Sequence, residues 1–170
     1  DGVIQYKNGT PVQSYNEKNA FKETAGGYGS GYCYIDGLAF DKNGNLWMTS
    51  SEVNHAVLVL DKAGAWHRLD IKQLRGVYTI NDILITSTND KWIYVPRNTP
   101  KLVMIPNSES LDEVSSYEFT TLIDTDGKEL TPSNYTCVAE DKDGYIWVGT
   151  NRGAVYFTKP RICLLYTSDA

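Results

Sequence analysis

The chain has 170 residues, of which 41% are hydrophobic and 22% are charged, as is usual for a globular protein with its own core. Its net charge is −5, which argues against a nucleic-acid-binding surface, because such a surface needs clustered Lys and Arg to neutralise phosphates. The sequence also contains no run of roughly 18–20 apolar residues, the length that a membrane-spanning helix requires. Twelve Tyr and four Trp against two Met favour β structure, since aromatic side chains suit a pleated, half-buried surface.

The N-terminal part predicts a strand followed by a glycine-rich connection. Residues 2–6 are expected to form the first strand. Residues 26–31, Gly-Gly-Tyr-Gly-Ser-Gly, fit neither of the glycine patterns that bind phosphates, and no helix follows them, so they are expected to link two sheets. Tyr28, Tyr32 and Tyr34 are the candidate ligand-binding residues, because their rings offer a flat surface on which a sugar can stack.

Three segments of the chain align on their tryptophans, Trp47, Trp92 and Trp147, which are 45 and 55 residues apart. The aligned segments are residues 37–49, 83–95 and 137–149. Each combines an alternating apolar run, a short polar turn and a second run that carries the tryptophan, which is the pattern of a β-hairpin. A period of roughly 40–50 residues with several short strands indicates the blade of a β-propeller. The three tryptophans are therefore predicted to be structural residues of the repeat.

The geometry of the hairpin turns explains why Asp and Gly recur in them. Asp41 and Asp141 begin the two stronger turns, where an aspartate accepts hydrogen bonds from the turn backbone. Gly44 and Gly144 end them, where a positive φ is needed. In the middle copy Asp90 is expected to replace this glycine, so that turn should differ or carry mild strain.

Further strands follow each tryptophan. Residues 55–60 form an apolar run expected to be buried on both faces, residues 61–64 form a turn, and residues 65–69 form a fourth strand. Residues 101–105 and 153–157 take the third-strand position of the later repeats.

These repeats predict an all-β chain. Residues 1–162 are expected to be a partial β-propeller, a fragment with about two complete four-stranded blades and two partial ones. Blades bury their faces against neighbouring blades, so we expect the fragment alone to be marginally stable or prone to aggregation.

The acidic turns do not complete a calcium-binding loop. An EF-hand loop would need a ligand where Ala139 stands and a bidentate Glu where Thr150 stands, and Ala39 and Ser50 fail in the same way in the first repeat. The Asp-Thr-Asp-Gly run at 124–127 is likewise expected to be a structural turn. No metal and no cofactor is expected.

The cysteines and histidines give no catalytic pattern. Cys33, Cys137 and Cys163 lack the spacing of a zinc or redox site, and Cys137 is expected to be a small buried residue of a strand. His55 and His67 have no carboxylate or nucleophile at a suggestive spacing and are expected to be ordinary polar strand residues. We therefore expect no catalytic residues, and a propeller hydrolase or lyase is disfavoured because no histidines and carboxylates converge.

Residues 141–153, Asp-Lys-Asp-Gly-Tyr-Ile-Trp-Val-Gly-Thr-Asn-Arg-Gly, resemble the two-component-regulator propeller repeat found in secreted and periplasmic proteins of Bacteroidetes-type bacteria. Over residues 33–157, the order of the pieces, including the insertion at 107–117, resembles the family of PorZ-like propellers in the type IX secretion system. The segments that carry this wider resemblance are 37–50, 57–69 and 124–150.

The resemblance implies a binding or scaffold module that is not an enzyme. Its place would be the periplasm or the outer-membrane surface, and its partners would be other secretion-complex proteins or anionic lipopolysaccharide. The same repeat family also includes the periplasmic, glycan-sensing propellers of hybrid two-component histidine kinases, and this alternative stays open.

The last eight residues, 163–170, resemble the translation of a sequencing-library adapter. They are expected to be a non-native tail and are set aside from the fold. On this interpretation the natural protein continues beyond Ile162.

Overall fold

The computed structural model describes residues 2–24, 31–123 and 126–158. Within these residues the regular elements are short strands, apart from a 3-10 helix, η2 (Lys72–Leu74), that follows the sixth strand. No helix in the described part is long and apolar enough to cross a membrane. The strands are β1 (Val3–Lys7), β2 (Thr10–Tyr15), β3 (Ile35–Phe40), β4 (Leu46–Ser50), β5 (Val57–Leu60), β6 (Trp66–Leu69), β7 (Ile83–Ile85), β8 (Lys91–Val95), β9 (Lys101–Ile105), β10 (Tyr117–Phe119), β11 (Leu122–Ile123), β12 (Glu129–Leu130), β13 (Tyr135–Glu140), β14 (Ile146–Thr150) and β15 (Gly153–Phe157).

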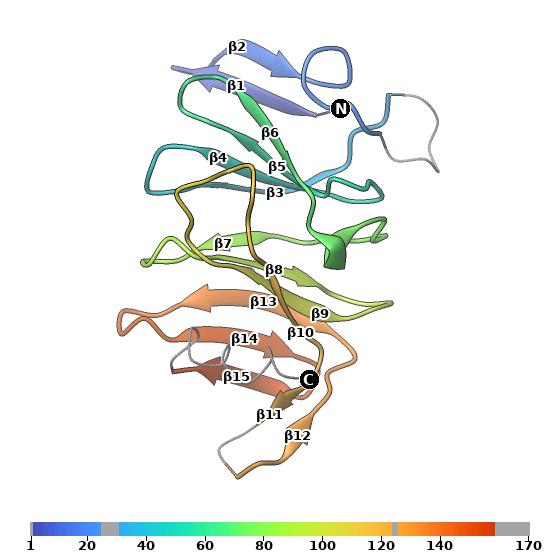
Figure 1. The fold of residues 1–170 in the computed structure, drawn as a ribbon, viewed down its shortest axis with the longest axis vertical. Coiled ribbons are helices and arrows are strands. Elements are labelled where there is room, and N and C mark those ends of the chain that lie inside the picture. The colour runs from blue at the N-terminus through green and yellow to red at the C-terminus, as the bar shows by residue number, and fades with distance from the viewer. Residues whose placement is uncertain (1, 25–30, 124–125, 159–170) are drawn as a thin grey trace. The chain divides into compact units, whose positions relative to one another are not determined.

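These strands form antiparallel sheets in simple sequence order (Figure 1). Two of the sheets have four strands, β3-β4-β5-β6 and β7-β8-β9-β10, while β1-β2 and β13-β14-β15 are smaller. A short hairpin, β11-β12, lies between the second four-stranded sheet and the last sheet in the sequence. The prediction of an all-β chain with two four-stranded blades and two partial ones is confirmed.

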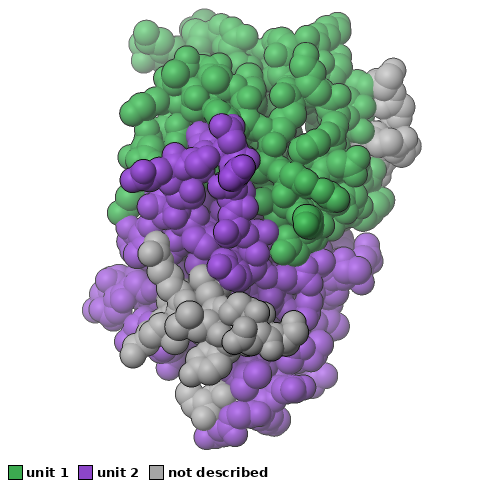
Figure 2. Space-filling view, in the orientation of Figure 1, with its two compact units in different colours: residues 1–80 green, residues 81–170 purple. Residues whose placement is uncertain are grey.

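The described chain divides into two compact units, residues 1–80 and 81–170 (Figure 2). In the first unit the β1-β2 hairpin packs on the β3–β6 sheet through aromatic side chains. The ring of Trp66 receives Tyr15 and Phe21 in edge-on contacts, with ring centroids 5.5 and 5.6 Å apart. Met48 and Leu58 complete this core from the sheet. Such apolar burial is the main stabilising contribution to the unit.

In the second unit the β13–β15 sheet lies against the β7–β10 sheet (Figure 1). Trp92 is fully buried between them. Its ring stacks on that of Phe119 at a centroid distance of 5.7 Å and lies 5.3 Å from the ring centroid of Phe157. Tyr135 is also fully buried, and burial raises the pKa of its hydroxyl to about 12. A hydrogen-bonded clamp joins the two sheets, since the Ser87 amide and hydroxyl donate to the Glu140 carboxylate over 2.6 and 2.5 Å.

One face of the β13–β15 sheet is exposed. Trp147 is 41% exposed and Tyr156 is 52% exposed, and the two rings stack with centroids 4.8 Å apart. Cys137 projects from the same face, because it lies two residues before Ala139, the partner of Trp147 in the adjacent strand. The expectation that Cys137 is buried is therefore wrong: its thiol is exposed, and within the described chain it is Cys33 that is buried.

The predicted strand at residues 55–60 also begins later than expected. The observed strand β5 starts at Val57, because Ser50 and Ala56 close the preceding loop with a 2.8 Å backbone hydrogen bond. Val57, Leu58 and Val59 are buried on both faces of their sheet, as the unbroken apolar run indicated.

Candidate functional site

The first repeated turn is organised by the carboxylate of Asp41. This carboxylate accepts 2.9 Å hydrogen bonds from the backbone of Asn43 and Asn45, from the Asn45 side chain and from the Trp47 indole. Burial by itself raises the pKa of Asp41, but these donors outweigh it and hold the pKa below its usual value. Gly44 ends the turn at φ +84. The hydrogen bond between the Trp47 indole and the Asp41 carboxylate thus joins the turn to the second strand of the hairpin.

The turn at Asp141 repeats this arrangement in the second unit. Its carboxylate accepts hydrogen bonds from the backbone of Asp143 and Tyr145 over 2.9 and 3.0 Å, and from the Trp147 indole over 2.7 Å. The indole hydrogen bond is the largest cause that lowers the pKa of Asp141. Gly144 takes a φ of +81. The two copies differ in the exposure of the tryptophan, because Trp47 is buried and Trp147 is exposed to solvent.

A further copy of the turn lies between β5 and β6, where a turn was predicted over residues 61–64, but its contact with His67 was not predicted. Asp61 accepts from the backbone of Ala63 and Ala65 over 2.9 and 2.8 Å, and its other carboxylate oxygen lies 3.1 Å from Nε2 of His67. His67 therefore occupies the position that tryptophan takes elsewhere. The spacing of six residues, the same as from Asp41 to Trp47, was the available signal. The expectation that no carboxylate lies at a suggestive spacing from His67 is wrong, because Asp61 is its partner six residues earlier.

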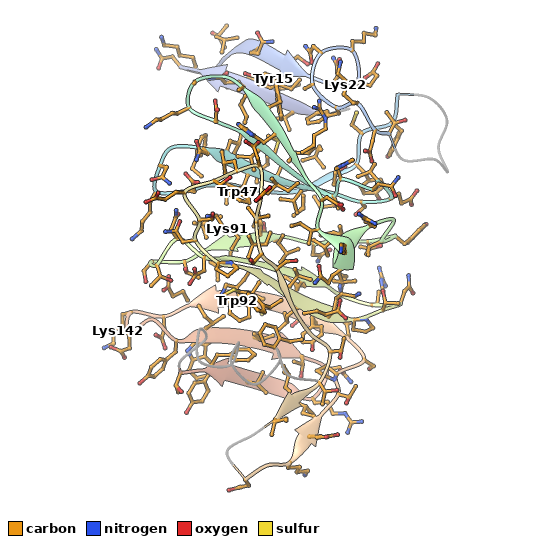
Figure 3. The ribbon with its side chains drawn as sticks, viewed as in Figure 1. Tyr15, Lys22, Trp47, Lys91, Trp92 and Lys142 are labelled. Carbon is orange, nitrogen blue, oxygen red and sulfur yellow. The ribbon has the colours of Figure 1, made fainter. Side chains whose placement is uncertain are left out.

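The middle copy departs from the pattern in a different way from the one expected. Asn89, at φ +66, takes the place of the glycine, so the assignment of that place to Asp90 is wrong. Thr86 replaces the aspartate, and its hydroxyl accepts the Asp90 amide over 3.0 Å. A threonine has no second oxygen for the indole, and Nε1 of Trp92 is buried without a hydrogen-bond partner. Figure 3 labels Trp47 and Trp92, which represent these two versions of the repeat.

Two of the three candidate ligand-binding tyrosines can be placed. Tyr28 lies outside the described residues, whereas the rings of Tyr32 and Tyr34 meet edge-on with centroids 5.6 Å apart. Tyr34 is 39% exposed, and its carbonyl accepts the Ser51 amide over 3.1 Å. This bond fixes the tyrosine pair beside the loop that joins β4 and β5.

The same loop borders a small pocket in the first unit. Its walls come from residues 21–23 before β3, from Ser50 and Val53, and from His55, Leu58 and Arg68. We call it the Arg68 pocket. Sequence reasoning could not assemble it, because its members lie up to 47 positions apart and share no motif.

The carboxylate of Glu23 organises one side of the Arg68 pocket. One oxygen contacts Nδ1 of His55, and the other accepts the backbone amides of Asn54 and His55 over 2.7 and 3.1 Å. These hydrogen bonds lower the pKa of Glu23 although burial opposes them. Glu23 is thus a carboxylate partner of His55 that no sequence spacing suggested, because it lies 32 positions away.

A serine and an aspartate meet in the first unit without forming a catalytic pair. The Ser51 hydroxyl donates to Asp36 over 2.6 Å and accepts the Ile80 amide over 2.8 Å. Burial raises the pKa of Asp36 to about 6, an effect that the Ser51 hydrogen bond opposes. Ser51 is fully buried, so a substrate cannot reach its oxygen. Across the described residues, no three His, Cys, Asp or Glu side chains gather in a way that would hold a metal ion.

Comparisons with known proteins agree with this architecture. The family model described as "Two component regulator propeller" matches residues 129–152. No curated protein sequence matches the chain. Among solved structures, PorZ, an essential bacterial surface component of the type IX secretion system of Porphyromonas gingivalis, aligns with a TM-score of 0.87 and 18% identity. That alignment covers 98% of this chain and 23% of PorZ, so the chain spans about a quarter of the length of PorZ.

Two other solved structures align more loosely. The extracellular domain of a putative hybrid two-component system from B. thetaiotaomicron has a TM-score of 0.50 and 15% identity, over 96% of this chain and 26% of its own. Virginiamycin B lyase from Staphylococcus aureus, in a catalytically inactive form, has a TM-score of 0.50 and 16% identity, over 75% of this chain and 42% of its own. The chain is thus made of β-propeller blades similar to those of PorZ, and its residues 129–152 match the model of the two-component-regulator propeller repeat.

Proposed function

We propose that this chain is part of a non-catalytic propeller that binds or scaffolds partners in type IX secretion, as a relative of PorZ. The observation that carries the proposal is the alignment with PorZ, at a TM-score of 0.87 over 98% of the chain. The alignment with the extracellular domain of the putative hybrid two-component system from B. thetaiotaomicron covers nearly as much of the chain, but its TM-score is only 0.50. The blade geometry of this chain therefore favours the secretion component.

Several polar side chains of the described residues have structural roles. The carboxylates of Asp41, Asp61 and Asp141 accept hydrogen bonds within their own turns, and the Ser51 hydroxyl is buried. In this proposal the partners are other secretion-complex proteins or anionic lipopolysaccharide, and the protein acts in the periplasm or at the outer-membrane surface.

A gene deletion in the source bacterium tests the proposal. Loss of the full gene should reduce the cargo that is released or attached at the cell surface, measured by immunoblotting of culture medium and outer-membrane fractions. Complementation with the intact gene should restore the cargo. Normal secretion in the deletion strain would contradict the proposal.

The second candidate is a glycan-sensing propeller, favoured by the two-component-regulator repeat at residues 129–152. In that case deletion should leave secretion intact and abolish the induction of genes by an oligosaccharide, measured by transcript sequencing. Tyr32 and Tyr34 are our proposed contacts for such a ligand, because their rings meet edge-on beside the β4–β5 loop and Tyr34 is exposed. If a Tyr34→Ala variant binds the oligosaccharide with unchanged affinity, the two tyrosines are not contacts of the ligand.

A further inference from the structure

Three loops of the first unit meet at one end of the β3–β6 sheet (Figure 1). The Ser51 amide, in the β4–β5 loop, donates to the Tyr34 carbonyl over 3.1 Å, just before β3. The next amide, that of Glu52, donates to the Val77 carbonyl over 2.8 Å, in the segment between η2 and β7. These two hydrogen bonds bring the backbones of Tyr34, Glu52 and Tyr78 next to one another. We call these three residues the Glu52 cluster.

A buried hydroxyl holds the loops of the Glu52 cluster in place. The Ser51 hydroxyl donates to Asp36 over 2.6 Å and accepts the Ile80 amide over 2.8 Å. Asp36 lies two positions after Tyr34. Ile80 likewise lies two positions after Tyr78. One fully buried serine thus anchors both segments that carry the tyrosines, so a ligand would not first have to order them.

The two tyrosines give the Glu52 cluster an accessible aromatic surface. Tyr34 is 39% exposed and Tyr78 is 59% exposed. Tyrosine is enriched in protein interfaces, where its ring supplies contact area and its hydroxyl a hydrogen bond. Aromatic rings also attract ammonium and guanidinium groups through their negatively charged faces. A ligand can therefore contact these side chains without any change in the buried core.

Glu52 adds a negative charge to the cluster. It is partly buried, and its φ of +62 lies in the left-handed region, which residues other than glycine adopt at a cost. Backbone strain of this kind concentrates at binding and active sites. Across the described residues, the Glu52 side chain forms no ion pair and no hydrogen bond. Its charge is therefore not neutralised within that part of the chain.

The cations in the neighbouring segment do not pair with Glu52. Arg75 donates two hydrogen bonds to the carboxylate of Asp70. Lys72 lies on η2, is exposed and forms no ion pair with Glu52. In a chain with a net charge of −5, an unneutralised carboxylate beside exposed aromatic rings favours a positively charged ligand. A neutral sugar would leave this charge without a counter-ion.

We propose that the Glu52 cluster binds a lysine or arginine side chain of a partner protein. The Glu52 carboxylate accepts hydrogen bonds from the ammonium or guanidinium group. The rings of Tyr34 and Tyr78 contact the cation and its methylene stem. This inference rests on the proposed function, since it gives a propeller that binds other secretion-complex proteins one contact surface and the chemistry of its partner.

An NMR titration of the isotope-labelled chain tests the cluster with two small probes. N-acetyl-arginine amide carries the proposed cation, and N-acetyl-citrulline amide has nearly the same shape without the charge. The arginine probe should shift the amide signals of Tyr34, Glu52 and Tyr78 saturably, with a dissociation constant in the millimolar range, as expected for a single side chain. The citrulline probe should bind at least about fivefold more weakly, because it lacks the charge-assisted contact.

Two variants separate the carboxylate from the rings. Glu52→Gln keeps the size of the side chain and should weaken the arginine probe by about fivefold to tenfold, whereas Tyr78→Ala should weaken it by about threefold. Glu109→Gln is the matched control, because Glu109 is an exposed carboxylate of the second unit, and it should change the affinity by less than about twofold. The citrulline comparison needs no variant, so it tests the charge even if a substitution disturbs the fold.

Three results would overturn the proposal. They are the absence of saturable shifts in the cluster, equal binding of the citrulline probe, and binding of the arginine probe that Glu52→Gln leaves unchanged. Maltose that shifts the same amides and binds more tightly than the arginine probe would also overturn it, because the cluster would then be a glycan site. A negative titration removes this site alone, since the secretion proposal is decided by cargo release from the deletion strain.

Discussion

Replacing Asp41 by alanine should destabilise the chain far more than the same change at Asp141. Both aspartates organise the same turn and both accept the indole of the tryptophan six residues later. They differ in burial, because Trp47 is 1% exposed and Trp147 is 41% exposed. Comparing the two variants therefore separates the contribution of a buried hydrogen-bond acceptor to stability from the contribution of the turn sequence.

The magnitude follows from the donors that lose their acceptor. Without the Asp41 carboxylate, the Asn45 amide, the Asn45 side chain and the Trp47 indole each lose this buried acceptor. Each such group costs about 1–3 kcal/mol when it stays unsatisfied, and relaxation of the turn recovers part of this. We expect a loss of about 3–5 kcal/mol in the free energy of unfolding. At Asp141 water replaces the carboxylate, and the loss should be much smaller.

Native-state hydrogen exchange is the suitable assay, because it reports the two hairpins separately within one molecule. Protection of the β3–β4 amides should fall in Asp41→Ala, whereas protection of the β13–β14 amides should change little in Asp141→Ala. Equal losses in the two variants would refute the reasoning, since burial would then not decide the value of the acceptor.

Three further predictions concern the first unit and the cysteines. Asp36→Asn should stabilise the chain by about 1–2 kcal/mol at pH 7 and by almost nothing at pH 4. The reason is that the pKa of Asp36 is raised to about 6, so that the free energy of unfolding falls as the pH rises from about 4 to 6. Urea unfolding at both pH values measures this, and a pH-independent gain would contradict it. Gly44→Ala should cost roughly 1–2 kcal/mol by the same measurement, because alanine is strained at φ +84, and an unchanged midpoint would exclude that strain. In a Cys163→Ser background, a thiol reagent should modify exposed Cys137 well before buried Cys33, whose pKa burial raises, and similar rates would disprove the assigned exposures.

Much of the fold could be read from local patterns. The strands at residues 101–105 and 153–157 were predicted with the bounds that the structure has. Alternating apolar residues and an Asp-x-x-Gly turn each act over fewer than ten positions, and the tryptophan that recurs every 45 or 55 residues agrees with them. The errors in this part were small, such as the turn residue Asn89, which adopts a positive φ as glycine does.

The tertiary structure decided everything that depends on distant partners. Glu23 meets His55 across 32 positions, and the Arg68 pocket forms only when the segment before β3 crosses the β3–β6 sheet. The same holds for exposure, since Trp92 and Trp147 share one register position but only the first is covered. The sequence alone determined which hairpins form, because turns and side-chain alternation are local properties. Which side chains become buried, paired or free to bind a ligand was decided by packing between elements, which no local pattern encodes.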